Sequence, residues 1–184
     1  IQPNNPPEIT SAVISPNQPA TVDDIQLIYT TQDLDNDPII DTEIEWRVNN
    51  ILTADTSTTV FSTATQKGEV WQVRIRASDG MDWSDWSVRE VLVGNTAPIV
   101  ESVSIQPDLV YTNDSVLVSY VYSDIDGDIS NNPAISWSKN GIEQPALNDL
   151  NPLPAEYTTK GDTWTVSLQA NDGESLSAAL QTTF

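Results

Sequence analysis

Apolar and polar residues alternate along most of this chain with a period of two residues. In an extended strand, this period places every second side chain on the same face, so the pattern predicts strands with one buried face. No stretch keeps a helical period for more than about a turn or two. We therefore predict an all-β chain. The inward-facing positions expected in the first half are Ala12, Ile14, Ile25, Leu27, Tyr29, Ile44, Trp46, Val48, Trp71, Val73, Ile75 and Ala77.

The same pattern occurs a second time. Many landmarks of the first half recur 91 residues later, and those beyond a two-residue length difference in the middle recur after 93. Self-similarity of this kind indicates one module written twice. We predict one domain over residues 1–94 and another over residues 95–184, each about the size of a small β-sandwich. Matching pairs include Thr21 and Thr112, Asp23 and Asp114, Tyr29 and Tyr120, Trp46 and Trp137, Trp71 and Trp164, and Asp79-Gly80 and Asp172-Gly173.

Each module reads as about seven short strands with a tryptophan on the third. The third strand ends at Asn49-Asn50 in one module and at Asn140-Gly141 in the other, and such dipeptides tolerate the positive φ of a hairpin turn. The final strands are expected near residues 88–93 and 176–184. The pattern predicts two tandem immunoglobulin-like Greek-key β-sandwiches without an inter-sheet disulfide. The linker over residues 94–98 contains Pro98 and should be stiff.

The chain has a net charge of −20 and contains neither cysteine nor histidine. Nucleic acid and anionic membranes are therefore not expected as partners, because binding either requires clustered basic residues. Without thiols or imidazoles, carboxylate oxygen remains the main metal ligand. No apolar run approaches the roughly 18 residues that a membrane span needs. Because the chain begins at Ile1 rather than Met, we expect a piece of a longer or processed precursor, for which export is permitted.

Three aspartates at alternate positions follow the second predicted strand of each module. In the predicted topology this loop meets the chain start and the Asp-Gly loop at one end of the sandwich. Flexible clusters of oxygen ligands suit calcium, which takes six to eight of them. We predict Ca²⁺ at each domain junction, where it would lock the angle between neighbouring domains; the alternative is a set of merely solvated loops. The expected ligands are Asn5, Asp33, Asp35, Asp37 and Asp79 in one module, and Asn95, Asp124, Asp126, Asp128 and Asp172 in the other.

A second feature occurs only in the first half, where the sequence Trp83-Ser84-Asp85-Trp86-Ser87 follows Arg74 and Arg76. It is similar to the WSXWS signature of cytokine-receptor fibronectin type III domains, but the paired cysteines of those receptors are missing. By alternation, both arginines point outward, as does Arg47 on the neighbouring strand. We predict a surface ladder of guanidinium groups and indoles. The alternative is a sugar-binding platform formed by Trp83 and Trp86.

The whole chain resembles the calcium-binding immunoglobulin-like, cadherin-like and polycystic-kidney-disease (PKD) type repeats of microbial surface proteins. The carriers of this resemblance are Asn95 to Pro98, the DxDxD motif at Asp124 to Asp128, and the run from Gly161 to Val166 that leads to Asp172-Gly173. The first half departs from it slightly, with Asn36-Asp37-Pro38 where the second has Gly127-Asp128-Ile129. The resemblance implies extracellular spacing, adhesion or matrix roles, and names no ligand.

Catalysis is not expected, because no nucleophile with a base, phosphate loop or pocket-forming chain is evident. We expect a non-catalytic structural or adhesive module of an exported cell-surface or filament protein. Its expected partners are neighbouring immunoglobulin-like domains or other subunits of a surface assembly. The alternative is a carbohydrate-binding or accessory module of a secreted enzyme, which would bind glycans through Trp83 and Trp86.

Overall fold

The computed structural model describes residues 3–184, which divide into two compact units, one up to Asn95 and one from Thr96 to Phe184. The sequence predicts this boundary one residue earlier, after Gly94. Asn95 stays with the first unit because its side-chain Oδ1 accepts a hydrogen bond of 2.8 Å from Lys67 Nζ. Among the described residues, no helix has the length and apolar character needed to cross a bilayer.

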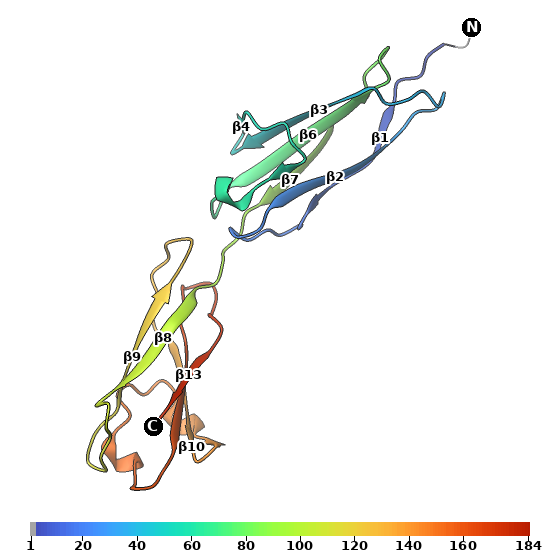
Figure 1. Cartoon of the computed structure of the whole chain (residues 1–184). Helices are drawn as coiled ribbons and strands as arrows, with labels where there is room; N and C mark the ends of the chain where they lie inside the picture. The colour runs from blue at the N-terminus through green and yellow to red at the C-terminus, as the bar shows by residue number, and fades with distance from the viewer. Residues whose placement is uncertain (1–2) are drawn as a thin grey trace. The chain divides into compact units, whose positions relative to one another are not determined.

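The first unit is a sandwich of two antiparallel sheets, as Figure 1 shows. One sheet has the order β1-β2-β5 and the other the order β4-β3-β6-β7, so the chain passes repeatedly from one sheet to the other. A short 3₁₀ helix, η1, spans Ser62–Ala64. The strands are β1 (Glu8–Ser15), β2 (Ile25–Gln32), β3 (Asp41–Val48), β4 (Ile51–Leu52), β5 (Thr59–Val60), β6 (Val70–Ser78) and β7 (Ser87–Leu92).

The second unit repeats this plan with sheets β8-β9 and β11-β10-β12-β13. The counterpart of β5 is reduced to one isolated bridge between Val116 and Leu153. The elements are β8 (Ile99–Gln106), β9 (Leu117–Ser123), β10 (Ala134–Lys139), β11 (Ile142–Glu143), η2 (Pro145–Leu147), η3 (Ala155–Tyr157), β12 (Trp164–Gln169) and β13 (Leu180–Thr183). These sheets confirm the predicted fold class of two immunoglobulin-like Greek-key sandwiches.

The last strand of the second unit is shorter than the sequence predicts. We expected it over residues 176–184, but β13 begins only at Leu180. Leu176 makes an isolated bridge to Asn171, and the next residue, Ser177, accepts a hydrogen bond from the amide of Ala170 on its Oγ. The hydroxyl of Ser177, rather than a backbone carbonyl, thus accepts the hydrogen bond from the Ala170 amide. The strand β13 starts three residues later.

A pair of tryptophans lies at the centre of each core. Trp46 on β3 packs edge-to-face on Trp71 of β6 with ring centres 6.2 Å apart, and Trp137 and Trp164 repeat this geometry at the same separation. Trp46 and Trp137 are 0% and 1% exposed. The indole N–H of Trp46 donates to the carbonyl of Ser57. The predicted alternation is confirmed along β6 and β12, where every inward residue is buried.

The hairpin turns also follow the sequence prediction. Asn49 and Asn50 both have positive φ, as do Asn140 and Gly141 in the second unit. These values place both central residues in the left-handed region, which tight two-residue hairpins require. The turns bring β4 and β11 back beside β3 and β10.

The core of the first unit can be tested by a matched pair of substitutions. Ile75→Ala removes a side chain that is 0% exposed, and we expect it to lower the free energy of unfolding of this unit by about 2–5 kcal/mol. Ile51→Ala makes the same change at a position that is 70% exposed, and should alter stability by less than about 0.5 kcal/mol. Urea titration followed by amide exchange would assign each effect to its unit. Equal effects of the two substitutions would contradict the described core.

Candidate functional site

The first aspartate triplet lies in the loop between β2 and β3. One carboxylate oxygen from each of Asp33, Asp35 and Asp37 lies within 4.8 Å of those of the other two. Asp33 organises the loop, since its Oδ1 accepts hydrogen bonds from the amides of Asp35 at 2.7 Å and Asp37 at 3.2 Å. Asn36 takes a positive φ at the turn. The alternate spacing therefore folds back on itself and gathers three negative charges.

The second triplet has the same construction between β9 and β10. The carboxylates of Asp124, Asp126 and Asp128 again lie within 4.8 Å of one another. Asp124 Oδ1 accepts hydrogen bonds from the amides of Asp126 at 2.8 Å and Asp128 at 3.4 Å. Gly127 takes the positive φ that Asn36 takes in the first unit. The two clusters are thus structural repeats as well as sequence repeats.

One carboxylate oxygen in each cluster is buried without a hydrogen-bond donor among the described residues. These atoms are Oδ2 of Asp33 and Oδ2 of Asp124. Asp33 as a whole is only 7% exposed. A buried, uncompensated carboxylate oxygen is costly, and it lies beside two further acids. An all-oxygen donor set with an unpartnered member fits a hard cation.

The segment that enters the first sandwich contacts both of its acidic loops. Asn5 donates from its amide N to Asp35 Oδ2 at 2.7 Å and from Nδ2 to the same carboxylate. Asn4 Nδ2 donates to Asp79 at 3.0 Å and to Asp82 at 2.9 Å. A hollow of about 680 Å³ is bordered by Asn4, the residues from 34 to 37, and Met81. The chain start and the two loops thus gather at one end of this unit.

The aspartates of the two Asp-Gly turns lie outside the clusters of three carboxylates. Asp79 Oδ1 accepts hydrogen bonds from the amides of Met81 and Asp82, both at 2.7 Å. The amide of Asp82, followed by the side chain of Asn4, lowers the pKa of Asp79 below its ordinary value. Asp172 Oδ1 likewise accepts from the amides of the two residues after Gly173, at 2.7 and 2.6 Å. Both aspartates therefore shape their own turns.

The predicted ligand Asn95 corresponds by register to Asn4 rather than to Asn5. The amide of Thr96 donates to Asp126 Oδ2 at 2.7 Å, as the amide of Asn5 donates to Asp35. Sequence reasoning treated Asn5 and Asn95 as equivalent ligands and so missed Asn4. Counting 91 residues back from Asn95 would have found it.

The arginines and tryptophans of the first unit interleave on the outer face of the β3–β6 pair. The guanidinium carbon of Arg76 lies 4.5 Å from the ring centre of Trp83 and 4.6 Å from that of Trp86. Arg74 lies 4.3 Å from Trp86. Each indole thus carries a guanidinium group from its own chain, which favours the structural ladder over a sugar platform. Trp83 and Trp86 also border an open hollow of about 530 Å³ beside Pro6 and Pro7.

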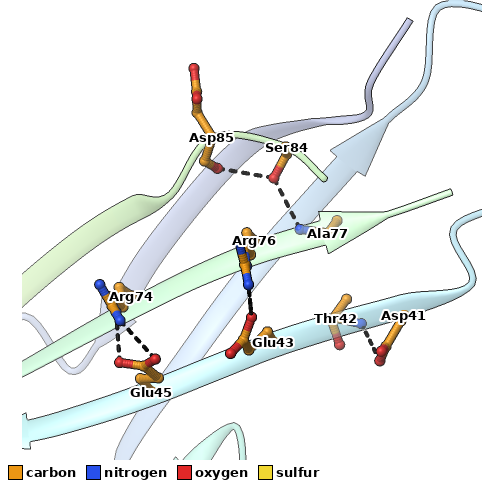
Figure 2. Close-up of polar contacts among 9 residues, drawn as sticks. All are labelled: Asp41, Thr42, Glu43, Glu45, Arg74, Arg76, Ala77, Ser84 and Asp85. Atoms are coloured by element: carbon orange, nitrogen blue, oxygen red, sulfur yellow. Dashed lines mark hydrogen bonds and ion pairs between the residues drawn. The ribbon is translucent and has the colours of Figure 1, made fainter. Parts of the chain in front are cut away.

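Two glutamates on β3 complete this ladder, and sequence reasoning missed them. Arg74 pairs with Glu45 through Nε at 2.6 Å and Nη2 at 2.7 Å, and Arg76 pairs with Glu43 (Figure 2). Glu45 also lies 3.9 Å from Arg47, the third predicted member. The hydrogen bond from Arg74 lowers the pKa of Glu45 and raises that of Arg74. The feature that identifies these pairs is the register between β3 and β6, which sets Glu45 opposite Arg74 and Glu43 opposite Arg76.

The serine of the tryptophan motif has a backbone role that is independent of the ladder. Ser84 Oγ accepts from the amide of Ala77 and donates to the carbonyl of Asp85 (Figure 2). Ser177 makes the same two bonds in the second unit, to Ala170 and Ala178. The second unit has no arginines or tryptophans at the ladder positions. The serine therefore shapes the segment before the last strand in both repeats.

No protein-family model and no curated protein matches this sequence. Among solved structures, the chain is similar to a two-domain fibronectin type III segment from chicken tenascin. The two share 10% sequence identity over 98% of this chain and 99% of that one, with a TM-score of 0.46. We draw no functional argument from a likeness this distant, and the site must be interpreted from its own chemistry.

The ladder can be tested by removing its central member. Arg76→Ala deletes two indole contacts and the ion pair with Glu43, and should lower the free energy of unfolding of the first unit by about 1–2 kcal/mol. Arg47→Ala, on the same sheet face, removes only a 3.9 Å ion pair and should cost less than about 0.5 kcal/mol. Urea unfolding of both variants would measure the difference. Equal losses of unfolding free energy in the two variants would show that the contacts of Arg76 with the indoles do not stabilise the unit.

The acid partner gives a pH signature. Because the pKa of Glu45 is lower in the folded unit, its stabilising effect is present above its unfolded pKa of about 4.3 and is lost as pH falls through the folded value. Glu45→Gln should therefore reduce the unfolding midpoint of the first unit near pH 7 and converge with the parent chain in acid. Glu101→Gln, in the second unit, should leave the first unit unchanged. A Glu45→Gln deficit that persists unchanged at pH 2 would contradict this assignment.

Proposed function

We propose that this chain is a non-catalytic, calcium-binding structural module of an exported surface or filament protein. Each aspartate triplet binds one Ca²⁺ at the end of its sandwich where the chain enters. The observation that carries the proposal is the buried Oδ2 of Asp33, which has no hydrogen-bond donor among the described residues and lies beside two further carboxylates.

Electrostatic repulsion supports a cation at each cluster. Two unit charges 4 Å apart repel by about 4 kcal/mol at an effective dielectric constant of about 20. Three carboxylates within 4.8 Å of one another, in a chain of net charge −20, therefore favour neutralisation. A bound divalent cation would supply positive charge and Lewis acidity to the oxygens of each triplet.

The donor set favours calcium over magnesium. The ligands come from a short loop outside the strands, and calcium accepts irregular sets of six to eight oxygens. Magnesium prefers a strict octahedron and retains more of its water. Neither nitrogen nor sulfur side-chain ligands of the kind that zinc prefers are present in the sequence.

The clusters are coupled to the segments that enter each sandwich. The amide of Asn5 binds Asp35, and the amide of Thr96 binds Asp126. A cation that fixes these carboxylates would also fix the backbone that donates to them. Calcium would thereby stiffen a tandem array, because fewer linker residues remain able to bend. This mechanical role suits a spacer or adhesive scaffold whose partners are neighbouring immunoglobulin-like domains or other subunits of a surface assembly.

Calcium binding is tested by titration of the chelator-treated chain. We expect about two Ca²⁺ per chain and a rise in the melting temperature of both units, since a ligand at 100 times its Kd stabilises the folded state by about 2.7 kcal/mol. Asp33→Asn should remove one binding event and the calcium-dependent rise of the first unit only. Glu8→Gln deletes one exposed negative charge on β1 and should keep both binding events.

Two outcomes separate binding from stiffening. Millimolar calcium that releases no heat and leaves both melting temperatures unchanged would overturn the metal assignment. Small-angle scattering measures how widely the overall dimensions of the chain are distributed. If calcium binds but does not narrow this distribution, the metal sites stand and their mechanical role is wrong. Magnesium at the same concentration serves as the comparison cation.

A further inference from the structure

The second unit has an open, largely apolar slot at the end of its last strand, of about 540 Å³. Leu109 and Tyr111 lie at the slot and are each 66% exposed. Trp164 and Phe184 also line it, and nothing within residues 3–184 fills it. Exposed apolar side chains gathered around a hollow are typical of an interaction site.

The first unit shows what fills the corresponding slot. Beyond β7, the chain continues into Val93, which is 1% exposed and belongs to the core. The carbonyl of Val93 accepts from the amide of Gly68 at 2.8 Å, and its amide donates to the carbonyl of Glu69 at 2.9 Å. Gly94 then pairs in parallel with Ala20. The continuation of the last strand thus acts as a plug.

Every receptor residue of this plug has a counterpart that lines the slot of the second unit. Gly68 and Glu69 correspond to Gly161 and Asp162 by the repeat of 93 residues, and Pro19, Ala20 and Thr21 correspond to Val110, Tyr111 and Thr112 by the repeat of 91. All five counterparts border the slot. The local hydrogen bonds match as well: Asp114 caps the turn at Tyr111 as Asp23 caps the turn at Ala20.

The strand registers place the plug position relative to Phe184. Trp71 pairs with Val91 in the first unit, and Trp164 exchanges two hydrogen bonds of 3.0 Å with Phe184 in the second. Phe184 is therefore the counterpart of Val91. The position that corresponds to Val93 lies two residues beyond Phe184, in the direction in which β13 already runs.

One further difference marks the slot. The indole N–H of Trp71 donates to Glu69 Oε2 at 2.9 Å. Trp164, which is 2% exposed, has no acceptor for its indole N–H among the described residues. The residue in place of Glu69 is Asp162, which is one methylene shorter. Both carboxylates accept a hydrogen bond from the amide three residues earlier, and that of Asp162 also pairs with Lys139. Within residues 3–184, the buried indole N–H of Trp164 thus lacks the acceptor that its counterpart Trp71 has.

We propose that this slot is the receptor for an extended strand segment joined to Phe184, with a valine-sized apolar side chain at its second residue. The segment pairs with Gly161 and Asp162 on one side and with Tyr111 on the other, as Val93 and Gly94 pair in the first unit. The occupant is supplied in cis, because Phe184 is already held at the mouth of the slot in the register that leads into it.

The test extends the full chain after Phe184 with Leu-Val-Gly-Asn, a copy of residues 92–95, and compares it with an extension of Leu-Asp-Gly-Asn. Burying the valine should reduce the unfolding equilibrium constant of the second unit by about tenfold or more, whereas the aspartate extension should change it by less than about twofold. Slower amide exchange at Gly161 should accompany the first extension only. The first unit, whose slot is filled, serves as the internal reference in both chains.

The proposal would be overturned if the two extensions stabilised the second unit equally, or if neither extension stabilised it. Addition of the free peptide acetyl-Leu-Val-Gly-Asn to the unextended chain tests a strand supplied in trans. If millimolar peptide reproduces the full effect of the tethered valine, the assignment in cis is wrong. Val93→Ala, which should raise the unfolding constant of the first unit by about tenfold, verifies that the method resolves a plug of this size.

Discussion

The packing of a tryptophan on the third strand against a tryptophan on the sixth is the contact on which each sandwich depends. Trp46 and Trp71, and their counterparts Trp137 and Trp164, stand edge-to-face at 6.2 Å. Ile25 and Leu27 of β2 belong to the core of the first unit, and Val100 of β8 and Val118 of β9 belong to the core of the second. Backbone pairing sets the spacing of β3 from β6 and of β10 from β12, and the indoles fill the core on the inner face of each of these sheets. The loops at the ends of the sandwich then have defined positions.

Those loops carry the acidic chemistry of the chain. A rigid core permits three carboxylates to be held near one another, because the folding energy gained by burial offsets their mutual repulsion. Asp33 and Asp124 each accept hydrogen bonds from loop amides on one oxygen, and the other oxygen is buried with no donor in the part of the chain that the structure describes. The same division of labour in both repeats indicates that the arrangement belongs to the module rather than to one loop.

Much of this architecture could be predicted from the sequence, because period-two alternation and the in-register repeat report directly on strands and modules. The burial of Ile44, Val73 and Leu168 follows from alternation alone. Partners across strands could not be predicted in the same way. Glu45 and Arg74 meet only because the β3–β6 register sets them opposite each other, and no local pattern encodes that register. The contacts of Asn4 were missed because Asn95 was matched with Asn5, which is one residue out of the 91-residue repeat.

The plug formed by Val93 bears on where a domain of this type ends. The strand β7 ends at Leu92, yet Val93 is a core residue that still makes backbone hydrogen bonds, and Asn95 is still held by Lys67. The last strand therefore does not mark the limit of the cooperative unit. Excising such a domain at its final ladder residue would remove a side chain that seals its interior, so the proper place to divide neighbouring repeats lies behind the plug.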